Sequence, residues 1–175
     1  MIQYNQIEFS VYKPHTPVYY VTCHSSWGNI LLLTTEEGIC GIHFLEKPLR
    51  YYLQLAEQRF NISLTHIPTQ ARDEWKYEVR SSTVLSLVVQ GTVFQQRVWK
   101  ALCSIPIGIT CSYQMLAIRL GCLQSIRAVA NAIAQNFIAC LIPCHRIIRK
   151  NGQIGGYRWG VVRKKALLAY EKTFL

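Results

Sequence analysis

The chain has 175 residues, of which 50% are hydrophobic and 16% charged, and this composition excludes a disordered or collagen-like protein. It holds neither an apolar run near the ~18 residues of a membrane-spanning helix nor a secretory signal, and its seven irregularly spaced cysteines predict reduced thiols in a soluble, cytoplasmic protein. The formal net charge of +10 at pH 7 favours a polyanionic partner.

The amino-terminal half is expected to form a small β-meander with helices. A helix is predicted at residues 49–60 and a second one at 71–79, and residues 85–89 form either a strand or a buried connector. Residues 1–90 are therefore interpreted as an α+β scaffold that carries no recognisable chemistry. Three segments rich in β-branched and aromatic residues, separated by turns, predict the strands of the meander: 18–23, 29–34 and 38–44.

After residue 91 the sequence predicts three helices. Thr92 and Gln95 form a capping box that begins the first, which ends before Pro106 and Gly108. Ser112 can cap the second helix, which ends at a glycine, and a serine four residues later can cap the third. Two short helices joined by a glycine turn are typical of a helix-turn-helix.

Charge strengthens the interpretation as a nucleic-acid-binding unit. Residues 92–175 hold twelve Lys or Arg and one acidic residue, a net charge of +11. Residues 1–91 hold seven Lys or Arg and eight acidic residues, a net charge of −1. A segment that excludes carboxylates this completely favours a polyanion as its partner over a surface adapted only for solubility. The single carboxylate, Glu171, is expected to have a function.

The third helix is expected to present small residues outward, together with one cation, Arg127. A helix that reads the major groove usually presents several long polar side chains, whereas small residues let a backbone approach a narrow minor groove closely. Packing of the alanines against another helix explains the pattern equally well. The outward residues predicted beside the arginine are Ala128, Asn131, Ala132 and Gln135.

The motif Ile-Pro-Cys-His-Arg is the strongest chemical signal. It follows an apolar run, residues 138–142, that is expected to form a buried strand or strand-like segment. Cys144 is a candidate nucleophile, and His145 and Arg146 are expected to lower the pKa of its thiol. His145 can act as the base and Glu171 can orient it, which predicts a Cys-His-Glu relay. Because neighbouring residues of a strand point to opposite faces, a bend or a water is required between the thiol and the imidazole.

Neither a metal site nor a cofactor is expected. The cysteine and histidine pairs of two predicted strands lack the knuckle spacing of a zinc site: Cys23, His24, Cys40 and His43. The remaining thiols are interpreted as small apolar residues of the core: Cys103, Cys111, Cys122 and Cys140.

Residues 91–171 closely resemble the catalytic domain of the O6-alkylguanine-DNA alkyltransferases, particularly the carboxy-terminal domain of the bacterial Ada-type protein. Residues 18–90 loosely resemble the variable amino-terminal domain of that family. The resemblance implies an α+β fold, with a scaffold at residues 1–90 and a winged-helix-like helix-turn-helix catalytic domain at residues 91–175. The matching stretches are GTVFQQRVWKAL, IPIGITCSY, IRAVANAIAQN, IPCHRII, GGYRWG and KKALLAYEK.

The resemblance also implies an activity, the transfer of an alkyl group from O6 of guanine to Cys144, once per molecule. By this resemblance His145 deprotonates the thiol through a water and Glu171 orients the histidine. Tyr113 matches the residue that helps neutralise charge on the leaving guanine. Asn136 matches the residue that braces the link between the recognition helix and the active-site segment.

The implied substrate is double-stranded DNA that carries O6-alkylguanine, with O4-alkylthymine as a further candidate, bound by a monomer without a membrane or a cofactor. Arg127 matches the arginine that fills the stack after the damaged nucleotide is flipped out. Trp159 is expected either to narrow the pocket beside the alkyl group or to pack in the core. The DNA contacts implied are Tyr113, Gln114, Ser125, Arg127 and Ala128, and the pocket residues are Ile147, Tyr157 and Arg158.

Two other functions remain as alternatives. A thiol hydrolase or acyltransferase would use the same three residues, Cys144, His145 and Glu171, but would not need the basic helices. A non-enzymatic helix-turn-helix protein that binds DNA or a lesion would need the helices but not the three residues.

Overall fold

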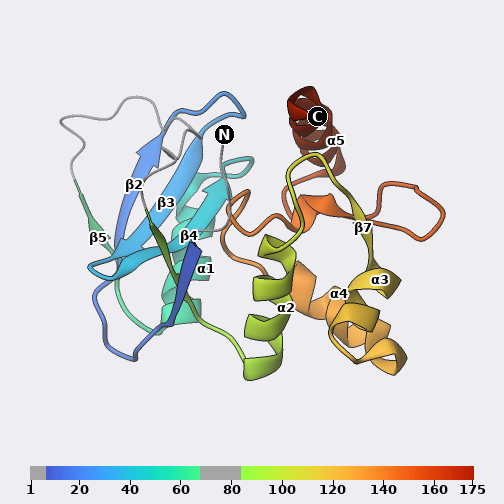
Figure 1. The fold of residues 1–175 in the computed structure, drawn as a ribbon. Coiled ribbons are helices and arrows are strands. Elements are labelled where there is room, and N and C mark those ends of the chain that lie inside the picture. The colour runs from blue at the N-terminus through green and yellow to red at the C-terminus, as the bar shows by residue number, and fades with distance from the viewer. Residues whose placement is uncertain (1–6, 68–83) are drawn as a thin grey trace. The chain divides into compact units, whose positions relative to one another are not determined.

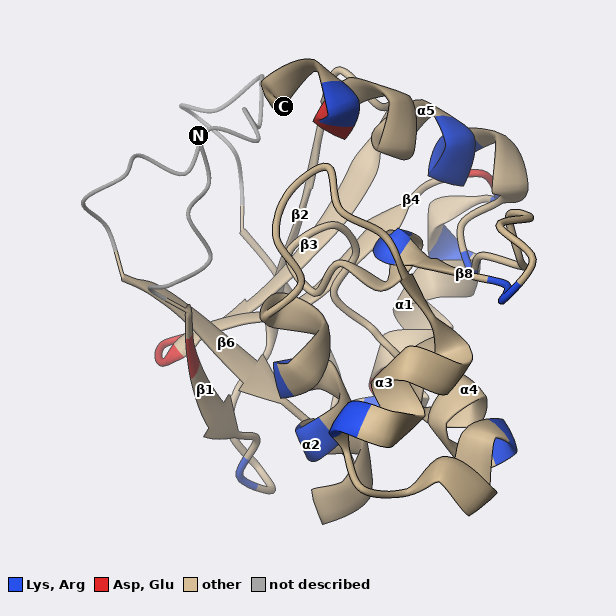
Figure 2. Cartoon of the chain, turned by 45° about the vertical axis from the view of Figure 1, so that its right-hand side comes forward, with Lys and Arg blue, Asp and Glu red and all other residues tan. Residues whose placement is uncertain are grey.

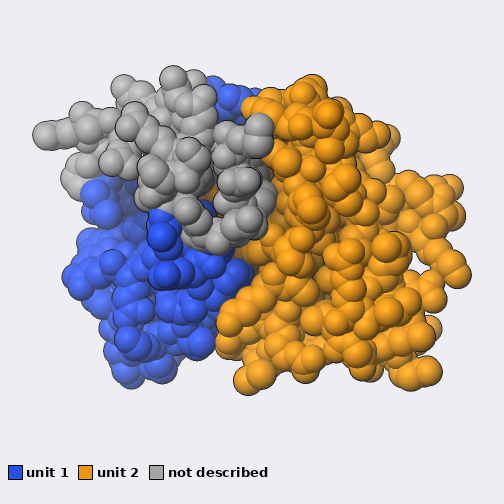
Figure 3. All heavy atoms as spheres, viewed as in Figure 1, with its two compact units in different colours: residues 1–90 blue, residues 91–175 orange. Residues whose placement is uncertain are grey.

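The computed structural model describes residues 7–67 and 84–175 (Figure 1). Two compact units divide the chain, residues 1–90 and residues 91–175, and they are coloured separately in Figure 3. The helix predicted at residues 71–79 lies outside the described residues.

The described part of the first unit is built on a six-stranded mixed sheet in the order β1-β6-β4-β3-β2-β5. Strands β2, β3 and β4 form the predicted antiparallel meander, whereas β1 and β4 each pair parallel with β6, and β5 pairs parallel with β2. The expected meander is therefore only the middle of a larger sheet. The strands are β1 (Ile7–Val11), β2 (Tyr19–Cys23), β3 (Ile30–Thr35), β4 (Gly38–Phe44), β5 (Thr65–His66) and β6 (Leu85–Val89).

One described helix of the first unit, α1 (Leu49–Phe60), has the bounds that its sequence predicts. It begins after Pro48 and ends at Asn61, whose φ of 54° is the left-handed conformation that stops a helix. Its buried face includes Phe60, whose ring lies 4.8 Å from that of Tyr12, and the helix thereby packs on the residues that follow β1.

The second unit is mainly helical, and a short parallel pair, β7 with β8, joins two of its loops (Figure 1). Within the described residues, no helix combines the length and the apolar character needed to cross a bilayer. Its elements are α2 (Val93–Cys103), β7 (Cys111–Ser112), α3 (Tyr113–Arg119), a 3-10 turn (Leu123–Ser125), α4 (Ile126–Ala134), a 3-10 turn (Cys144–Arg146), β8 (Ile147–Ile148), α5 (Val161–Glu171) and a 3-10 turn (Lys172–Phe174).

Helix α2 begins with the predicted capping box and anchors the helices that follow. The Thr92 hydroxyl accepts a hydrogen bond from the backbone N–H of Gln95 at 3.2 Å, and the Gln95 side chain accepts one from the N–H of Thr92 at 2.9 Å. On the buried face of α2, the indole of Trp99 donates to the carbonyl of Ala132 at 2.8 Å. This bond joins α2 to α4 through a buried polar pair.

Helices α3 and α4 form the predicted helix-turn-helix. Ser112 caps α3, since its hydroxyl accepts the N–H of Met115 at 3.1 Å, and Gly121 with a φ of 68° leads out of that helix. The expected cap at Ser125 is wrong. Ser125 belongs to a 3-10 turn with φ −115° and ψ 32°, which is not the extended conformation that a capping side chain requires.

Two other expectations for this region are also wrong. Ala132 does not face outward, because it is 3% exposed and its carbonyl receives the Trp99 indole. Residues 138–142 do not form a strand but a buried turn, in which Leu141 donates to Ala139 and Ile142 donates to Ile138. A run of buried apolar residues is compatible with either structure, so the pattern alone does not distinguish them.

Substituting Thr92 with alanine should lower the free energy of unfolding by about 1 kcal/mol, because the first turn of α2 loses the hydroxyl that accepts from Gln95. Equilibrium urea unfolding measures the change. Thr92→Ser keeps the hydroxyl and serves as the matched control, so an equal loss in both variants would contradict the role of the cap.

Candidate active site

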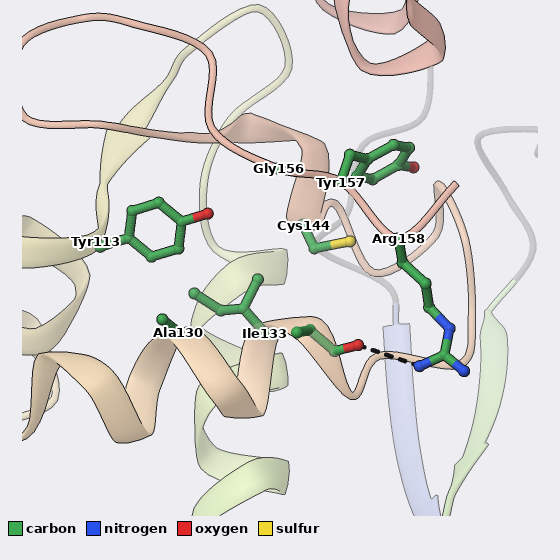
Figure 4. A pocket seen from close by; sticks show the side chains of 8 residues that line it. Tyr113, Ala130, Ile133, Cys144, Gly156, Tyr157 and Arg158 are labelled. Carbon is green, nitrogen blue, oxygen red and sulfur yellow. Dashed lines mark hydrogen bonds between the residues drawn. The ribbon is translucent and has the colours of Figure 1, made fainter. Parts of the chain in front are cut away.

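Cys144 lies in the 3-10 turn that precedes β8, and its side chain reaches a cavity of about 260 Å³ (Figure 4). Cys144 is 5% exposed and is one of the residues that line this cavity. The walls come from α3, from α4 and from residues 156–158, which we name the pocket loop. The lining residues are Tyr113, Ala130, Ile133, Ala134, Cys144, Gly156, Tyr157 and Arg158.

The side chain of Asn136 braces the buried turn that carries Cys144. Its amide nitrogen lies 3.1 Å from the Ile138 carbonyl, 3.0 Å from the Ile142 carbonyl and 3.2 Å from Sγ of Cys144. Its oxygen accepts the N–H of Ile138 at 2.9 Å. A single buried amide therefore replaces the hydrogen bonds that a strand would have made, and it fixes the position of the sulfur.

His145, Arg146 and Glu171 form a buried charged cluster behind the thiol. Nε2 of His145 lies 2.7 Å from Oε1 of Glu171, and the Arg146 guanidinium donates through Nε to Oε2 at 2.8 Å and through Nη2 to Oε1 at 2.7 Å. The backbone N–H of Gly108 donates to Oε2 at 3.3 Å. The other imidazole nitrogen, Nδ1 of His145, is buried and has no hydrogen-bond partner among the described residues.

Burial and the charges of the cluster both change the pKa values of these groups, and burial acts in opposite directions on the carboxylate and the imidazole. Burial alone would raise the pKa of Glu171, but the hydrogen bonds and charges of His145 and Arg146 lower this pKa to about 2. Burial lowers the pKa of His145, and the neighbouring cations Arg146 and Lys164 lower it further, against the opposing effect of Glu171. Glu171 is thus ionised at neutral pH, and the pKa of His145 is lowered although a carboxylate lies beside the ring.

The thiol does not have the depressed pKa that the sequence predicts. Burial raises the pKa of Cys144 to about 11, against the lowering effects of the Asn136 hydrogen bond and of the Lys164 charge. Arg146 was expected to lower this pKa, but its guanidinium is bound to Glu171 on the far side of the cluster. Proton loss from Cys144 therefore depends on a base that accepts the proton.

Lys164 is a site residue that the sequence analysis missed. Its side chain is fully buried in α5, and its ammonium donates to the carbonyls of Ile147 and Gly156, which ties β8 to the pocket loop. Desolvation lowers the pKa of this lysine to about 8. Helical spacing could have revealed it, since Lys164 lies four residues before the apolar Leu168 and seven before Glu171, on one face of the helix.

Of the predicted pocket residues, Tyr157 and Arg158 line the cavity, and Ile147 does not. Ile147 is fully buried in β8 behind the thiol, where its backbone pairs with β7. Figure 4 shows Arg158 bonded to the carbonyl of Ala134 at the end of α4, at a distance of 3.2 Å. Of the two alternatives for Trp159, the structure agrees with packing in the core, because this side chain is 4% exposed, does not line the cavity and packs edge-on against Tyr157.

The predicted DNA contacts lie on or beside the two helices of the helix-turn-helix. Ser125, Arg127 and Ala128 are exposed, while Gln114 and Tyr113 are half-buried at the start of α3. Figure 2 shows Lys and Arg residues of this unit on α2, α3, α4 and α5 and beside β8. The exposed cations are Arg97, Lys100, Arg119, Arg127, Arg149, Lys150, Arg158, Lys165 and Lys172.

The described residues bring no three His, Cys, Asp or Glu side chains together as a metal site would require. The site brings together a thiol facing a small cavity, a buried pair of imidazole and carboxylate, and exposed cations on the helices around the cavity.

Residues 93–173 match the sequence profile of the 6-O-methylguanine DNA methyltransferase, DNA binding domain. A methylated-DNA–protein-cysteine methyltransferase of Methanosarcina barkeri is 35% identical over 158 residues, which cover 90% of this chain and 99% of that protein. The chain belongs to the 6-O-methylguanine DNA methyltransferase family.

The chain is also similar to Ada proteins. The regulatory protein Ada of Salmonella typhimurium is 55% identical over 153 residues, or 83% of this chain and 43% of that protein. The bifunctional transcriptional activator and DNA repair enzyme Ada of Escherichia coli is 38% identical over 161 residues, which cover 88% of this chain and 45% of that protein. The chain thus spans less than half the length of these two relatives.

Solved structures of the 6-O-methylguanine DNA methyltransferase family share the fold. The structure of Mycobacterium tuberculosis OGT in complex with DNA superimposes with a TM-score of 0.69 and 33% identity, over 89% of this chain and 93% of that one. The resemblance to alkyltransferases and the α+β fold class that the sequence predicts are both confirmed.

Replacing Asn136 with alanine should lower the free energy of unfolding by about 2–3 kcal/mol, because buried carbonyls of the turn lose their donor. Gln135→Ala, at the exposed neighbouring position, is the control and should change stability by less than about 0.5 kcal/mol. Urea unfolding of both variants measures the difference. If they lose equal stability, the bracing role assigned to Asn136 is wrong.

Proposed function

We propose that this chain repairs alkylated DNA by accepting the alkyl group of O6-alkylguanine on Cys144 and keeping it. The observation that carries the proposal is the position of a buried thiol at a cavity of about 260 Å³, on a basic helix-turn-helix unit and in front of a His145–Glu171 pair. A cavity below the ~300–1,000 Å³ of sites for drug-sized ligands suits one base with a small substituent.

The proton of the thiol leaves through His145. Because Nε2 of this residue faces the ionised Glu171 at 2.7 Å, the neutral ring carries its proton there and its lone pair on Nδ1. Nδ1 makes no hydrogen bond within the described residues, so it is the atom available to take the Cys144 proton through a water. Glu171 then stabilises the imidazolium that forms.

The transfer itself is a single displacement at the alkyl carbon. The Cys144 thiolate attacks that carbon, the new S–C bond forms as the C–O6 bond breaks, and the bonding electrons of C–O6 remain on the guanine. The hydroxyl of Tyr113, which lines the cavity, donates to the base as it acquires this charge. The product is a thioether and an unmodified guanine.

Cys144 is used once. A thioether has no polarised carbonyl for water to attack, and the groups assigned to the site supply neither a second nucleophile nor a reductant. Each molecule therefore removes one alkyl group, and the protein is consumed in the reaction.

The nucleotide must leave the DNA stack to reach the thiol, because a buried sulfur cannot approach an alkyl carbon inside a duplex. The exposed Arg127 and Ala128 at the start of α4 support approach from the minor groove, with the arginine taking the place of the extruded base. By this proposal double-stranded DNA is the partner of residues 91–175, residues 1–90 act as a scaffold, and the protein acts as a monomer.

The transfer assay uses a duplex with a radiolabelled O6-methylguanine, and the label should move onto the Cys144 peptide with a limit of one methyl per protein. Cys144→Ser should reduce transfer below detection, because an alcohol is almost never ionised near neutral pH. Cys23→Ala, at a half-buried thiol in the other unit, is the control and should retain transfer.

The same assay separates the alternative functions. Binding of the lesion duplex without any transfer by the wild type would indicate a non-enzymatic lesion-binding protein. Hydrolysis of thioester substrates without label on the protein would indicate a thiol hydrolase. Transfer by Cys144→Ser would remove Cys144 from its assigned role.

Arg127→Ala should slow methyl transfer from duplex DNA by about tenfold, which corresponds to a loss of about 1.4 kcal/mol of transition-state stabilisation. Transfer from a single strand should change much less, since no stack has to be filled there. Arg119→Ala removes another exposed cation and is the control for general electrostatic loss. Equal slowing of the Arg127→Ala variant on both substrates would contradict the wedge role.

A further inference from the structure

Arg146 is buried behind the His145–Glu171 pair and shares its carboxylate. The exposed fraction of this arginine is 0%, and its guanidinium holds Glu171 with two bonds, Nε to Oε2 at 2.8 Å and Nη2 to Oε1 at 2.7 Å. The same Oε1 lies 2.7 Å from Nε2 of His145. The imidazole thus faces a carboxylate whose negative charge is already largely balanced.

We infer that Arg146 is a positioning residue whose charge sets the pH at which the Cys144–His145 pair becomes competent for transfer. The inference rests on the proposed alkyl transfer, since it concerns the proton that leaves the thiol in that reaction. Arg146 acts through Glu171, to which its guanidinium donates two hydrogen bonds.

The geometry supplies the reason. A buried carboxylate beside a histidine normally raises the proton affinity of the ring, because the imidazolium is attracted to the negative charge. Here a guanidinium lies on the same two oxygens, where it weakens that attraction and also repels the imidazolium. Removing the positive charge would leave Glu171 facing His145 alone, so both the imidazole and the thiol would hold their protons to higher pH.

The other charged and titratable groups around His145 act in the same field. Glu171 and Lys164 belong to α5, and Cys144 belongs to the same turn as His145. Tyr157, in the pocket loop, stands edge-on to the imidazole, with 6.4 Å between the centres of the two rings. Glu171 is the single carboxylate in residues 92–175. Among the groups named, Arg146 is the cation bonded to that carboxylate, so its charge is the one expected to set the proton affinity of His145.

Arg146 also fixes the place of the carboxylate in the fold. Its Nη1 donates to the carbonyl of Ile105, and Oε2 of Glu171 receives the N–H of Gly108 from the same loop. If Arg146 had only a structural role, holding these segments together would be its whole effect. The inferred role predicts in addition a change in pH dependence, which loss of packing alone would not produce.

The test replaces Arg146 with citrulline, which keeps the planar shape, the Nε–H and one NH2 group of arginine, places a carbonyl oxygen where the other terminal nitrogen was, and removes the charge. The thiol of Cys140 allows the full chain to be assembled by ligation of residues 1–139 to a synthetic segment, 140–175. The control is the same ligated chain with arginine. Folding of both chains is checked by circular dichroism.

In the Arg146→citrulline chain, the acid limb of the pH dependence of methyl transfer should move up by about one pH unit, a tenfold change in proton affinity. The NMR titration of His145, labelled at its Cε1 carbon in the synthetic segment, should move in the same direction. Recombinant Arg146→Lys keeps the charge without the two-pronged contact, so its acid limb should stay near that of the wild type while its plateau rate falls.

An acid limb and a His145 titration that stay in place in a folded citrulline chain would overturn the inference, even if the rate falls. An Arg146→Lys limb displaced by a full pH unit would overturn it as well, and this variant decides the question if the citrulline chain does not fold. Failure of the proposed function is separate. It would appear as absence of methyl transfer in the arginine control, where the His145 titration still tests the effect of the charge.

Discussion

The site depends on one buried carboxylate. Glu171 is the single acidic residue in residues 92–175, and it is 1% exposed. A carboxylate in that position is costly to desolvate unless donors surround it, and here they come from His145, Arg146 and the backbone of Gly108. These donors belong to the active-site turn and to the loop after α2, while the carboxylate belongs to α5. The active-site turn, the loop after α2 and α5 thus meet at one charge.

The second constraint is the conformation of the segment between α4 and the thiol. Its apolar side chains are buried, but it forms a turn and not a strand, so some of its backbone polar groups need side-chain partners. Asn136 supplies them, and the sulfur of Cys144 is one of the atoms that this amide contacts. The amide that satisfies the buried carbonyls therefore also contacts the sulfur of Cys144, so that, under the proposed function, stability and reactivity are coupled at Asn136.

Local signals were sufficient for much of the fold. The cap at Thr92 and the bounds of α1 follow from neighbouring residues, and the structure agrees with both. Parallel pairing of β1 with β6 joins segments far apart in the chain, which no local pattern reports. The errors at Ser125 and Ala132 have a similar origin, because a 3-10 turn gives Ser125 a conformation in which it cannot cap α4, and the Trp99 indole reaches across from α2.

The site was partly predictable for the same reason. Scarcity identified Glu171, and the motif around Cys144 identified the thiol and the imidazole. The pKa of the thiol was not predictable, because it depends on how completely the turn is buried, and adjacent cations in the sequence do not face the sulfur. Arg146 is the clearest example, since it follows the nucleophile by two residues yet binds Glu171.

The net charge of +11 in residues 92–175 therefore combines two kinds of cation. Those exposed on the helices can contact phosphates, where each one adds to a salt-dependent attraction. Arg146 and Lys164 are fully buried and cannot do so, and their charges act on Glu171, His145 and Cys144. Both kinds favour negative charge, the exposed ones on a polyanion at the surface and the buried Lys164 on the sulfur of Cys144. One bias in composition thus serves binding at the surface and thiolate chemistry in the interior, and only the structure separates the two.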